Sequence, residues 1–402
     1  MSLIVQKFGG SSVADAERIA RVAGIITETY DNGNSVVVVV SAQGDTTDEL
    51  IEKAHEINPN PSKREMDVLL STGEQITIAL LSMQLEKMGY PVISLTGWQV
   101  GIKTNKDNTK AKIKTVDNQR ILNELDKKRI VVVAGFQGIN SNDDITTLGR
   151  GGSDTTAVAI AAALKASCCE IYTDVDGVYT TDPRIVSNAK KLNDISYDEM
   201  LELAALGANV LHSRSVEMAK KYNVNLVVKS SFEKKEGTVV KEVNLVEQML
   251  VRGVARDNDV ARISVMGLSD EPGRAYTLFN CLAQAHISVD VILQSIGRDN
   301  SKDISFTVAA SDLEDAYKVI NDNKELIGAT DIKYKKEISK VSIVGAGMAS
   351  NPGVAVKMFE ALYDAQININ MISTSEIKIS VLIDEADAER AVKAIHAKFF
   401  DE

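Results

Sequence analysis

The chain has 402 residues, of which 44% are hydrophobic and 25% charged, and its formal net charge is −11. This length exceeds one ordinary domain, so two or three folded units are expected. The acidic balance argues against nucleic acid or an anionic membrane as the main partner, although a nucleotide needs only a locally positive site. No apolar run reaches membrane-span length, and a first strand expected at about residue 3 leaves no room for a signal peptide.

The cysteines and histidines suggest neither a disulfide framework nor a metal-ligand spacing. Adjacent cysteines do not easily pair with each other, and a set of unpaired thiols suits a reducing cytosol. We therefore predict free thiols, a cytoplasmic protein and no metal site built from protein ligands. The residues concerned are Cys168, Cys169, Cys281, His55, His212, His286 and His396.

The N-terminal stretch Lys7-Phe8-Gly9-Gly10-Ser11-Ser12 follows a short apolar run and precedes a helical pattern over 13–30. This order predicts a strand, a tight turn and a helix start. Glycines let a backbone approach a ligand closely, and free N–H groups at a helix start favour an anion. The stretch is either a phosphate site with Lys7 beside the anion or a common glycine turn with an exposed lysine. It is not a P-loop, whose lysine follows its glycines.

A continuous β-branched run over 36–40 predicts a strand buried on both faces of a parallel sheet. The polar loop Ser41-Ala42-Gln43-Gly44-Asp45-Thr46-Thr47 follows at its carboxyl end, where open α/β sheets bind ligands. Helices are expected over 48–57 and 64–88. The second contains Ser71-Thr72-Gly73-Glu74-Gln75, and this polar stretch with a glycine predicts a helix start or break.

Strands are next expected over 90–95 and 129–134, separated by a surface hairpin or loop over 101–114 and a helix over 116–128. A charge run of this kind is usually a solvated face, which is the prediction for the hairpin's lysines. These lysines are Lys103, Lys106, Lys110, Lys112 and Lys114.

A second glycine-rich stretch, Gly149-Arg150-Gly151-Gly152-Ser153-Asp154, leads into a strongly helical segment over 157–165. We expect Ser153 or Asp154 to be the N-cap of this helix. An arginine can bind a carboxylate through two parallel hydrogen bonds. The stretch therefore predicts a second anion-binding helix start.

A strand over 169–173 leads into Asp174–Arg184, in which Asp176-Gly177 predicts a turn between short strands. The further ligands that a calcium loop requires are absent. The remaining elements of this half are helices over 197–206 and 213–222 and a strand over 225–228, followed by Lys229-Ser230-Ser231.

Beyond about residue 245 an internal repeat begins. Pro272-Gly273 matches Pro352-Gly353, and Ile287 matches Ile367 at the same offset. Each repeat reads strand, helix, strand, strand, helix, which is the ferredoxin-like order. The predicted fold class is therefore α/β, with a mainly parallel three-layer domain followed by two small α+β domains.

The second repeat lacks a final strand, whereas the chain has a spare strand-like run around 249–256. Because an unpaired sheet edge is a liability, we predict that this run completes the second repeat and that the first is inserted within it. The stretch Gly345-Ala346-Gly347-Met348-Ala349-Ser350 resembles a dinucleotide fingerprint. We reject that interpretation, since its third glycine is missing and the partner repeat has no such pattern.

Two anion-binding helix starts, together with Lys7, Arg150 and Lys229, suggest two anionic ligands brought together, one of them a nucleotide triphosphate with Mg²⁺. If the other is a carboxylate, no general base is needed, because a carboxylic acid with a pKa near ~4 is already ionised at neutral pH. Catalysis then reduces to positioning and charge neutralisation. His212 has no identifiable nucleophile beside it, so a structural or helix-start role is expected.

Five motifs in combination resemble the aspartate kinases. They are KFGGSS at 7–12, STGE at 71–74, GRGGSD at 149–154, TDVDGVYTTDPR at 173–184 and the paired PG-containing repeats. The resemblance covers essentially the whole chain. It implies an amino-acid-kinase (carbamate-kinase-like) domain over 1–245 and two ACT domains, over 260–338 and 339–402. It also implies phosphoryl transfer from MgATP to the side-chain carboxylate of L-aspartate.

Carried over position by position, the resemblance implies that Lys7 neutralises charge on the transferring phosphoryl group. It also implies that Asp154 orients Lys7 or other groups around the phosphoryl and does not act as a base. Arg150 would bind a substrate carboxylate, and Glu74 would hold the substrate ammonium. Further residues implied for the aspartate and phosphate pocket are Ser41, Thr47, Gly151, Gly152 and Ser153. Those implied for the nucleotide, besides Lys7, are Phe8, Gly9, Gly10, Ser11, Thr173, Asp174, Tyr179, Arg184, Lys229 and Ser230.

Taken without the family, these residues have plainer interpretations. Glu74 is then a helix-surface carboxylate, Asp154 a helix cap, and Ser41 and Thr47 common loop residues. His212-Ser213-Arg214 stands where many relatives have His-Pro, a change expected to be harmless.

The ACT pair implies at least a homodimer, inhibited by an amino acid such as lysine or threonine. The candidate effector contacts are Asp270, Gly273, Gln294, Asn370, Ser375 and Glu376. The last three could equally be exposed strand-end residues. An internal start at Met249 would make a separate regulatory chain, a hypothesis that a single band on a gel of the native protein contradicts.

Two other classes of function remain open. One is another amino-acid-kinase-fold enzyme, such as a glutamate or uridylate kinase, and the paired repeats and Glu74 disfavour it. The other is a catalytically silent amino-acid sensor, which would have no use for Lys7, Arg150 and Asp154.

Overall fold

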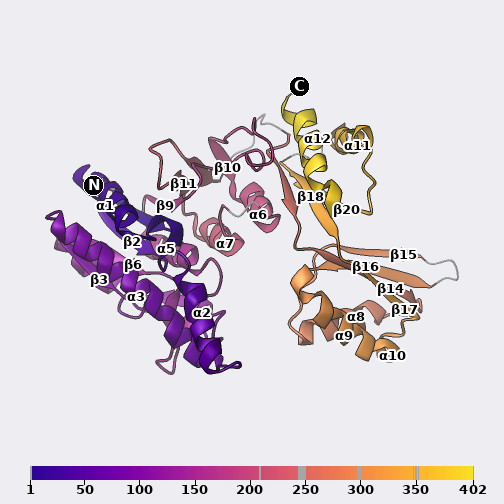
Figure 1. Cartoon of the computed structure of the whole chain (residues 1–402), viewed down its shortest axis with the longest axis horizontal. Helices are drawn as coiled ribbons and strands as arrows, with labels where there is room; N and C mark the ends of the chain where they lie inside the picture. Colours follow the sequence, from indigo (N-terminus) through magenta and orange to yellow (C-terminus); the bar gives the residue numbers. More distant parts are fainter. Residues whose placement is uncertain are drawn as a thin grey trace. The chain divides into compact units, whose positions relative to one another are not determined.

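The computed structural model describes residues 2–207, 210–242, 250–296, 301–346, 348, 351 and 353–401. The chain forms two compact units (Figure 1). Unit 1 comprises Met1–Tyr179 and Lys190–Val246, and unit 2 comprises Thr180–Ala189 and Glu247–Glu402. The ten residues from Thr180 to Ala189 are thus an excursion from unit 1 into unit 2.

The described part of unit 1 is built on an eight-stranded sheet in which only the pair β11 and β12 is antiparallel. In spatial order the strands are β10 (Asp194–Ser196), β12 (Thr238–Lys241), β11 (Leu226–Ser230), β9 (Cys168–Thr173), β1 (Leu3–Phe8), β2 (Ser35–Val40), β6 (Ile130–Ala134) and β3 (Val92–Leu95). The valines of β2 from Val36 to Val40 are fully buried, as a parallel strand covered on both faces requires. The mainly parallel sheet predicted from the sequence is confirmed.

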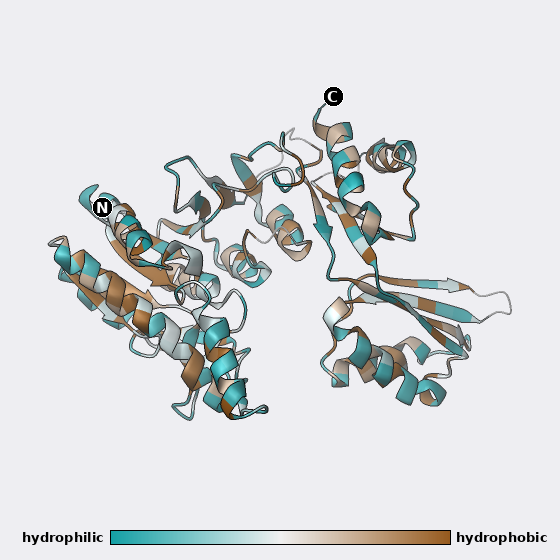
Figure 2. Ribbon diagram, in the orientation of Figure 1, coloured by the Kyte–Doolittle hydropathy of each residue, from teal (hydrophilic) through white to brown (hydrophobic). Residues whose placement is uncertain are grey.

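Helices cover both faces of this sheet. Alternate strand residues such as Val36 and Val38 share a core with α1 (Ala16–Asp31) and α3 (Lys63–Lys87). The intervening residues point to the opposite face, where α5 (Gly152–Leu164) contacts β1, β2 and β9. Figure 2 shows hydrophobic colour along the strands of this three-layer core. The other helices of unit 1 are η1 (Gly10–Ser12), α2 (Thr46–Ile57), α4 (Gln119–Asp126), α6 (Tyr197–Ala205) and α7 (Ser213–Tyr222).

A small second sheet lies in unit 1. Its order is β5 (Ile113–Val116), β4 (Ile102–Thr104), β7 (Gln137–Ile139) and β8 (Ile145–Thr147). The hairpin expected over 101–114 is present, and its five lysines are exposed, which confirms the solvated face. The short strands β7 and β8 were not expected, because three residues give no readable alternation.

Helix α3 runs without a break from Lys63 to Lys87, so the start or break expected at 71–75 is wrong. The glycine in this stretch serves close packing instead. A Cβ added to Gly73 would lie 2.8 Å from the Cβ of Ala42, in the loop after β2. Gly73 therefore lets α3 approach the carboxyl end of the sheet.

A pair of matched substitutions tests this role. Gly73→Ala should lower the melting temperature despite alanine's better helix propensity, because the added methyl group meets Ala42. Gly24→Ala, on the exposed face of α1 with no neighbouring atom within 4 Å, should raise stability by up to about 1 kcal/mol. Thermal melts of both variants check the contrast. Equal stabilisation by both would contradict the packing role of Gly73.

Among the described residues, α3 is the one helix long and apolar enough to cross a membrane by length and composition. Its Ile78, Leu81 and Leu85 instead pack in the core of unit 1. The helix also exposes Ile76, Leu80 and Met83, and Figure 2 shows this mixture of colours along it. Core helices of this kind pass the same test, so the finding is weak evidence for a membrane span.

Unit 2 contains two four-stranded sheets in its described residues. The first has the order β15 (Ile292–Ile296), β16 (Lys302–Val308), β14 (Ala261–Leu268) and β17 (Asp331–Lys335). The second has the order β13 (Gly253–Asp257), β18 (Ile338–Val344), β20 (Lys378–Asp384) and β19 (Met371–Thr374). The helices are α8 (Arg274–Gln284), η2 (Ala310–Asp312), α9 (Leu313–Asp322), α10 (Lys324–Ile327), α11 (Gly353–Asp364), η3 (Glu385–Asp387) and α12 (Ala388–Phe400).

Strand β13 pairs antiparallel with β18, from Gly253 opposite Val344 to Asp257 opposite Lys340. The strand therefore belongs to the second small sheet, although the first small sheet follows it in the chain. Met249, where the predicted run began, lies outside the described residues, as do parts of the rejected fingerprint over 345–350.

Candidate active site

The carboxyl ends of the central parallel strands meet at one place in unit 1. The Gly9 N–H donates to Tyr172 O at 3.3 Å, and the Ser41 N–H donates to Phe8 O at 3.1 Å, which joins the loops after β1, β9 and β2. Ser12 Oγ lies 2.7 Å from Ser231 Oγ, which adds the loop after β11. Carboxyl ends of parallel strands are where open α/β sheets hold ligands.

At this point Lys7 of β1 pairs with Asp154 of α5. Lys7 Nζ lies 2.6 Å from Asp154 Oδ1, and each side chain is only 12% exposed. A Cβ added to Gly9 would lie 3.5 Å from Lys7 Nζ, so the glycine turn lies directly over this charge. The alternative of an exposed lysine beside a glycine turn is therefore wrong.

Helix α5 begins differently from the sequence-based expectation. Its N-cap is Gly151, with a left-handed backbone at φ 69°, rather than Ser153 or Asp154. Both of those residues lie in the first turn of the helix and are buried. The N-terminal N–H groups of α5 and the Lys7–Asp154 pair thus belong to the same corner of the site.

Glu74 of α3 is 3% exposed, so the interpretation as a helix-surface carboxylate is wrong. Its Oε1 accepts a hydrogen bond from Ala42 N at 3.1 Å, and its Oε2 is buried with no hydrogen-bond partner among the described residues. Burial raises the pKa of Glu74 to about 8, against the smaller opposing effect of backbone hydrogen bonds. A buried carboxyl group with one empty oxygen is suited to receive a cation.

Arg150 is exposed on the loop that leads to Gly151, and the loop is held from α7 and the small sheet. Arg214 of α7 donates to Leu148 O at 2.9 Å and to Ala111 O at 2.8 Å. The buried Asp67 accepts from Thr147 Oγ1 at 2.5 Å and from Thr109 N at 3.0 Å. The loop that carries Arg150 is therefore anchored on both α7 and α3 by hydrogen bonds.

His212 lies directly against this loop. A Cβ added to Gly151 would come within 2.3 Å of its Cγ, so only glycine fits there. His212 is also the N-cap of α7, its Nδ1 accepting from Arg214 N at 3.4 Å. Partial burial lowers the pKa of His212, which keeps the imidazole neutral. The helix-start role expected for this histidine is present.

The remaining residues of the expected pocket lie directly after β2 and in the first turn of α2. Ser41 is half-buried at the end of β2, and Thr47 is the second residue of α2. A Cβ added to Gly10 would lie 2.8 Å from Ala42 O, so the two loops touch at their backbones.

Five of the residues expected to contact a nucleotide lie at the carboxyl ends of β9 and β11 or in the loop after β9. Thr173 Oγ1 donates to Asp174 Oδ1 at 2.9 Å. Lys229 Nζ lies 2.5 Å from Glu170 Oε1, and Ser230 Oγ accepts from two following backbone N–H groups. Arg184 is separate from this group, because it lies in the excursion to unit 2 and pairs there with Asp182.

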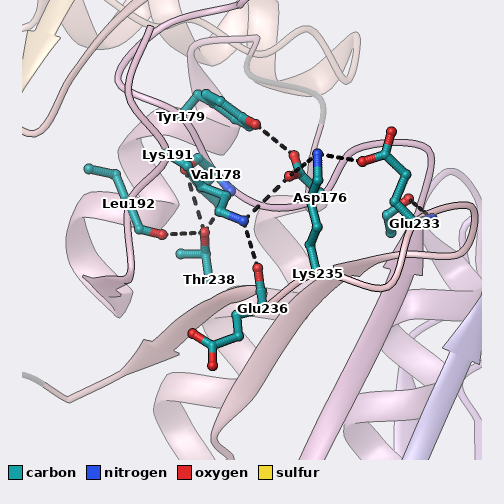
Figure 3. A network of polar contacts seen from close by, with 10 residues as sticks. Asp176, Val178, Tyr179, Lys191, Leu192, Glu233, Lys235, Glu236 and Thr238 are labelled. Carbon is teal, nitrogen blue, oxygen red and sulfur yellow. Dashed lines mark hydrogen bonds and ion pairs between the residues drawn. The ribbon is translucent and has the colours of Figure 1, made fainter.

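Tyr179 is held by a carboxylate that the sequence analysis did not select. Its hydroxyl donates to Asp176 Oδ1 at 2.7 Å (Figure 3). Asp176 also pairs with Lys191 at 3.3 Å. The predicted turn between short strands at Asp176-Gly177 is not a hairpin, since the described residues on either side form only one isolated bridge, Tyr179 to Lys191.

Glu170 is a second residue beside the candidate site that the sequence analysis missed. It accepts hydrogen bonds from Gln6 at 2.8 Å and from Tyr172 at 3.0 Å besides pairing with Lys229. A glutamate within a buried parallel strand was the available signal, because buried charges are normally paired. Arg214 and Asp67 carried no comparable signal.

The expected effector residues all lie in unit 2. Gln294 is on the exposed strand β15, and Gly273 is the left-handed N-cap of α8. Asp270 pairs with Lys302 at 3.3 Å, and Asn370 donates to Asp384 at 3.0 Å. Ser375 and Glu376 form the turn between β19 and β20.

Glycine turns, a buried lysine and a helix N-terminus meet at the ends of parallel strands in unit 1, an arrangement suited to binding anionic ligands. The model of the amino acid kinase family matches residues 2–230, and the ACT domain model matches residues 263–323 and 341–399.

Relatives with similar sequences cover the full chain. An aspartokinase of Bacillus sp. (strain MGA3) is 53% identical over 400 residues, covering 99% of this chain and 97% of the relative. Aspartokinase 2 of Bacillus subtilis (strain 168) is 50% identical, covering 99% and 98%. The structure of E. coli aspartokinase III in complex with aspartate and ADP has a TM-score of 0.85 at 26% identity, covering 99% of this chain and 100% of that one.

The chain therefore belongs to the aspartokinases, which are kinases with an amino-acid-kinase domain and C-terminal ACT domains. The predicted fold class and family are confirmed.

Proposed function

We propose that the protein transfers the γ-phosphoryl group of MgATP to the side-chain carboxylate of L-aspartate, giving 4-phospho-L-aspartate and ADP. The observation that carries this proposal is the buried Lys7–Asp154 pair at the ends of the central strands, with the half-empty carboxyl group of Glu74 also at this end of the sheet. A similar protein, E. coli aspartokinase III, has been crystallised with aspartate and ADP.

The attacking group needs no base, because the side-chain carboxylate of aspartate is ionised at neutral pH. The barrier is the repulsion between this anion and the γ-phosphoryl oxygens. The buried ammonium group of Lys7 would reduce that repulsion. Asp154, 2.6 Å away, would hold this ammonium group in place. The N–H groups of Gly10 and Ser11 and of the first turn of α5 supply further positive potential.

Substrate selection rests on two opposite charges. Arg150 would bind the α-carboxylate of aspartate, and Glu74 would receive its ammonium on Oε2. Ser41, Thr47, Gly152 and Ser153 would complete the pocket. In this arrangement the side-chain carboxylate is left to face the nucleotide.

The anchoring of the Arg150 loop by Arg214 gives a testable prediction. Arg214→Lys keeps the charge but cannot reach both Leu148 O and Ala111 O, so the loop loses one anchor. We expect the KM for aspartate to rise about tenfold, on the scale of one charged hydrogen bond, and the KM for ATP to stay unchanged. The exposed Arg21→Lys is the control. Equal effects on both KM values would contradict the assignment.

The nucleotide would contact Phe8, the ends of β9 and β11 and the loop after β9, through Thr173, Asp174, Tyr179, Lys229 and Ser230. The family resemblance adds Arg184 as a further contact. Among the described residues no group of three or more His, Cys, Asp or Glu is placed to hold a metal ion. Mg²⁺ bound chiefly by substrate phosphates needs only one or two carboxylates, which fits a metal that arrives with ATP.

We also propose feedback inhibition through the ACT domains by lysine, threonine or both. A structure of E. coli aspartokinase III contains lysine and aspartate. The effector would contact Asp270, Gly273, Gln294, Asn370, Ser375 and Glu376. The enzyme would be a cytoplasmic homodimer or larger, with domains over 1–245, 260–338 and 339–402, and it would begin the synthesis of lysine, threonine and methionine. A separate regulatory chain starting at Met249 remains a hypothesis.

Trapping the acyl phosphate with hydroxylamine tests the reaction. The full chain with MgATP and L-aspartate should give the hydroxamate, and L-glutamate should give little. Hydroxamate from glutamate, or ADP released with UMP as the acceptor, with no hydroxamate from aspartate, would favour another enzyme of the fold. No turnover with any acceptor, but binding of lysine or threonine, would favour a sensor. Repeating the assay with lysine, threonine and methionine, singly and in pairs, identifies the inhibitor.

A further inference from the structure

The excursion from Thr180 to Ala189 is part of the hydrophobic core of unit 2. Val186 is 8% exposed and belongs to the same buried cluster as Val392 and Ile395 of α12. Ile185 packs against that cluster from the side. A segment between two parts of unit 1 thus depends on unit 2 for its burial.

Hydrogen bonds also tie the excursion to unit 2 at both of its ends. Thr180 Oγ1 lies 2.9 Å from Nε2 of His396, a fully buried histidine on α12. Thr180 O accepts from Val254 N of β13 at 2.7 Å. Asn188 donates to Asp401 at 3.0 Å.

On the unit 1 side, one carboxylate joins the residue before the excursion to a residue just after it. Asp176 accepts from the Tyr179 hydroxyl and pairs with Lys191, as Figure 3 shows. Lys191 is held in turn by Glu236 O at 2.7 Å. Although burial pushes the pKa of Asp176 upward, the hydrogen bond from Tyr179 and the charge of Lys191 hold it below its usual range.

Thr238 of β12 repeats this connection one residue further out on each side. Its Oγ1 accepts from Val178 N at 2.8 Å and donates to Leu192 O at 2.6 Å (Figure 3). The stem of the excursion is therefore closed by two side chains. Tyr179 is its last residue in unit 1, and the next residue, Thr180, is already fixed to α12 and β13.

We propose that Asp176 is a positioning residue for the nucleotide, and that the excursion makes nucleotide affinity depend on the conformation of unit 2. The proposal rests on the proposed function in one respect, the contact of Tyr179 with the nucleotide. The route from the core around Val186 to Tyr179 runs through Thr180, which is held to His396 and Val254 and is joined to Tyr179 by a peptide bond. The hydrogen bond to Asp176 limits how far Tyr179 is displaced when Thr180 moves.

Direct binding of ADP to the full chain, measured by calorimetry, tests the first part. Asp176→Asn keeps an acceptor for Tyr179 but loses the ion pair with Lys191, so the Kd for ADP should rise about tenfold. The KM for aspartate should not change. An unchanged Kd for ADP, or an equal rise in the KM for aspartate, would overturn the positioning role.

A matched pair of core variants tests the second part. Val186→Ala and Val381→Ala each remove two methyl groups from the same core, but Val381 is on β20 and not in the excursion. Both should lower the melting temperature of unit 2 similarly. Only Val186→Ala should change the Kd for ADP, by threefold or more. Equal effects of the two variants, or none from Val186→Ala, would overturn the link.

The ADP-binding experiments can fail or succeed independently of the hydroxamate assay, because ADP binding needs no turnover. If the wild-type chain forms no hydroxamate yet the variants shift the Kd for ADP as expected, the reaction is wrong and the link stands. If the wild-type chain does not bind ADP, both are overturned.

Discussion

Replacing Lys7 with alanine should reduce kcat by at least about 10²–10³-fold, the scale measured when one preorganised donor is removed from a charged transition state. Lys7 lies 2.6 Å from Asp154, and its ammonium group is the most deeply buried positive charge of the expected site residues. No other lysine or arginine of the described site residues takes its place, since Lys229 is paired with Glu170 and Arg150 is exposed. The hydroxamate assay measures the loss.

The variant also leaves the carboxylate of Asp154 in a buried position without its partner, which can destabilise unit 1 by several kcal/mol. The double variant Lys7→Met with Asp154→Asn removes both charges and controls for this effect. It should fold more stably than Lys7→Ala and remain inactive. Unit 2 should melt as in the wild type and still bind its amino acid effector. Near-normal turnover in either variant would refute the assignment of Lys7.

Aspartate should bind more tightly as the pH rises from 6.5 to 8.5. The carboxyl group of Glu74 has a pKa of about 8 in the free protein, so below that pH it is mostly protonated and neutral. An ammonium group on Oε2 favours the ionised form, and binding below pH 8 therefore releases one proton. The Kd for aspartate should fall about tenfold per pH unit up to about pH 8 and then level off. Calorimetry in buffers of different ionisation enthalpy measures both the Kd and the proton release.

Glu74→Gln should weaken aspartate binding about 10–100-fold at pH 8.5 and abolish the pH dependence, since the charged hydrogen bond is lost. Its stability provides the control. The folded-state pKa of about 8 exceeds the ordinary value of 4.5, so ionisation of Glu74 costs stability as the pH rises through this range. The glutamine variant should thus melt above the wild type at pH 8.5. A pH-dependent Kd in the variant would contradict the role of Glu74.

Local patterns allowed much of the fold to be predicted. The valines of β2, the glycine turns after β1 and before α5, and the internal repeat all depend on residues close in sequence or on a fixed offset. The break expected in α3 was wrong because Gly73 is required for close packing against Ala42, a residue outside the helix. The N-cap predicted for α5 was wrong because the left-handed turn at Gly151 places the cap two residues before Ser153 and three before Asp154.

The residues that support the site were harder to find, because their partners are distant in sequence. Glu170 meets Lys229 across 59 positions, and Thr180 meets His396 across 216. No spacing rule connects residues so far apart. The charged members of such pairs can be suspected from their buried setting, whereas their partners become visible only in the fold.

The placement of β13 sets an order for how the protein is made. Residues 253–257 leave the ribosome before residues 258–337, yet their partner strand β18 begins only at Ile338. At roughly 5–20 residues per second, β13 waits several seconds with an open edge. The excursion at 180–189 waits longer, because Thr180 meets His396 on the final helix. The segment from Asp176 to Ala189 is therefore among the last parts of the newly made chain to reach its finished form.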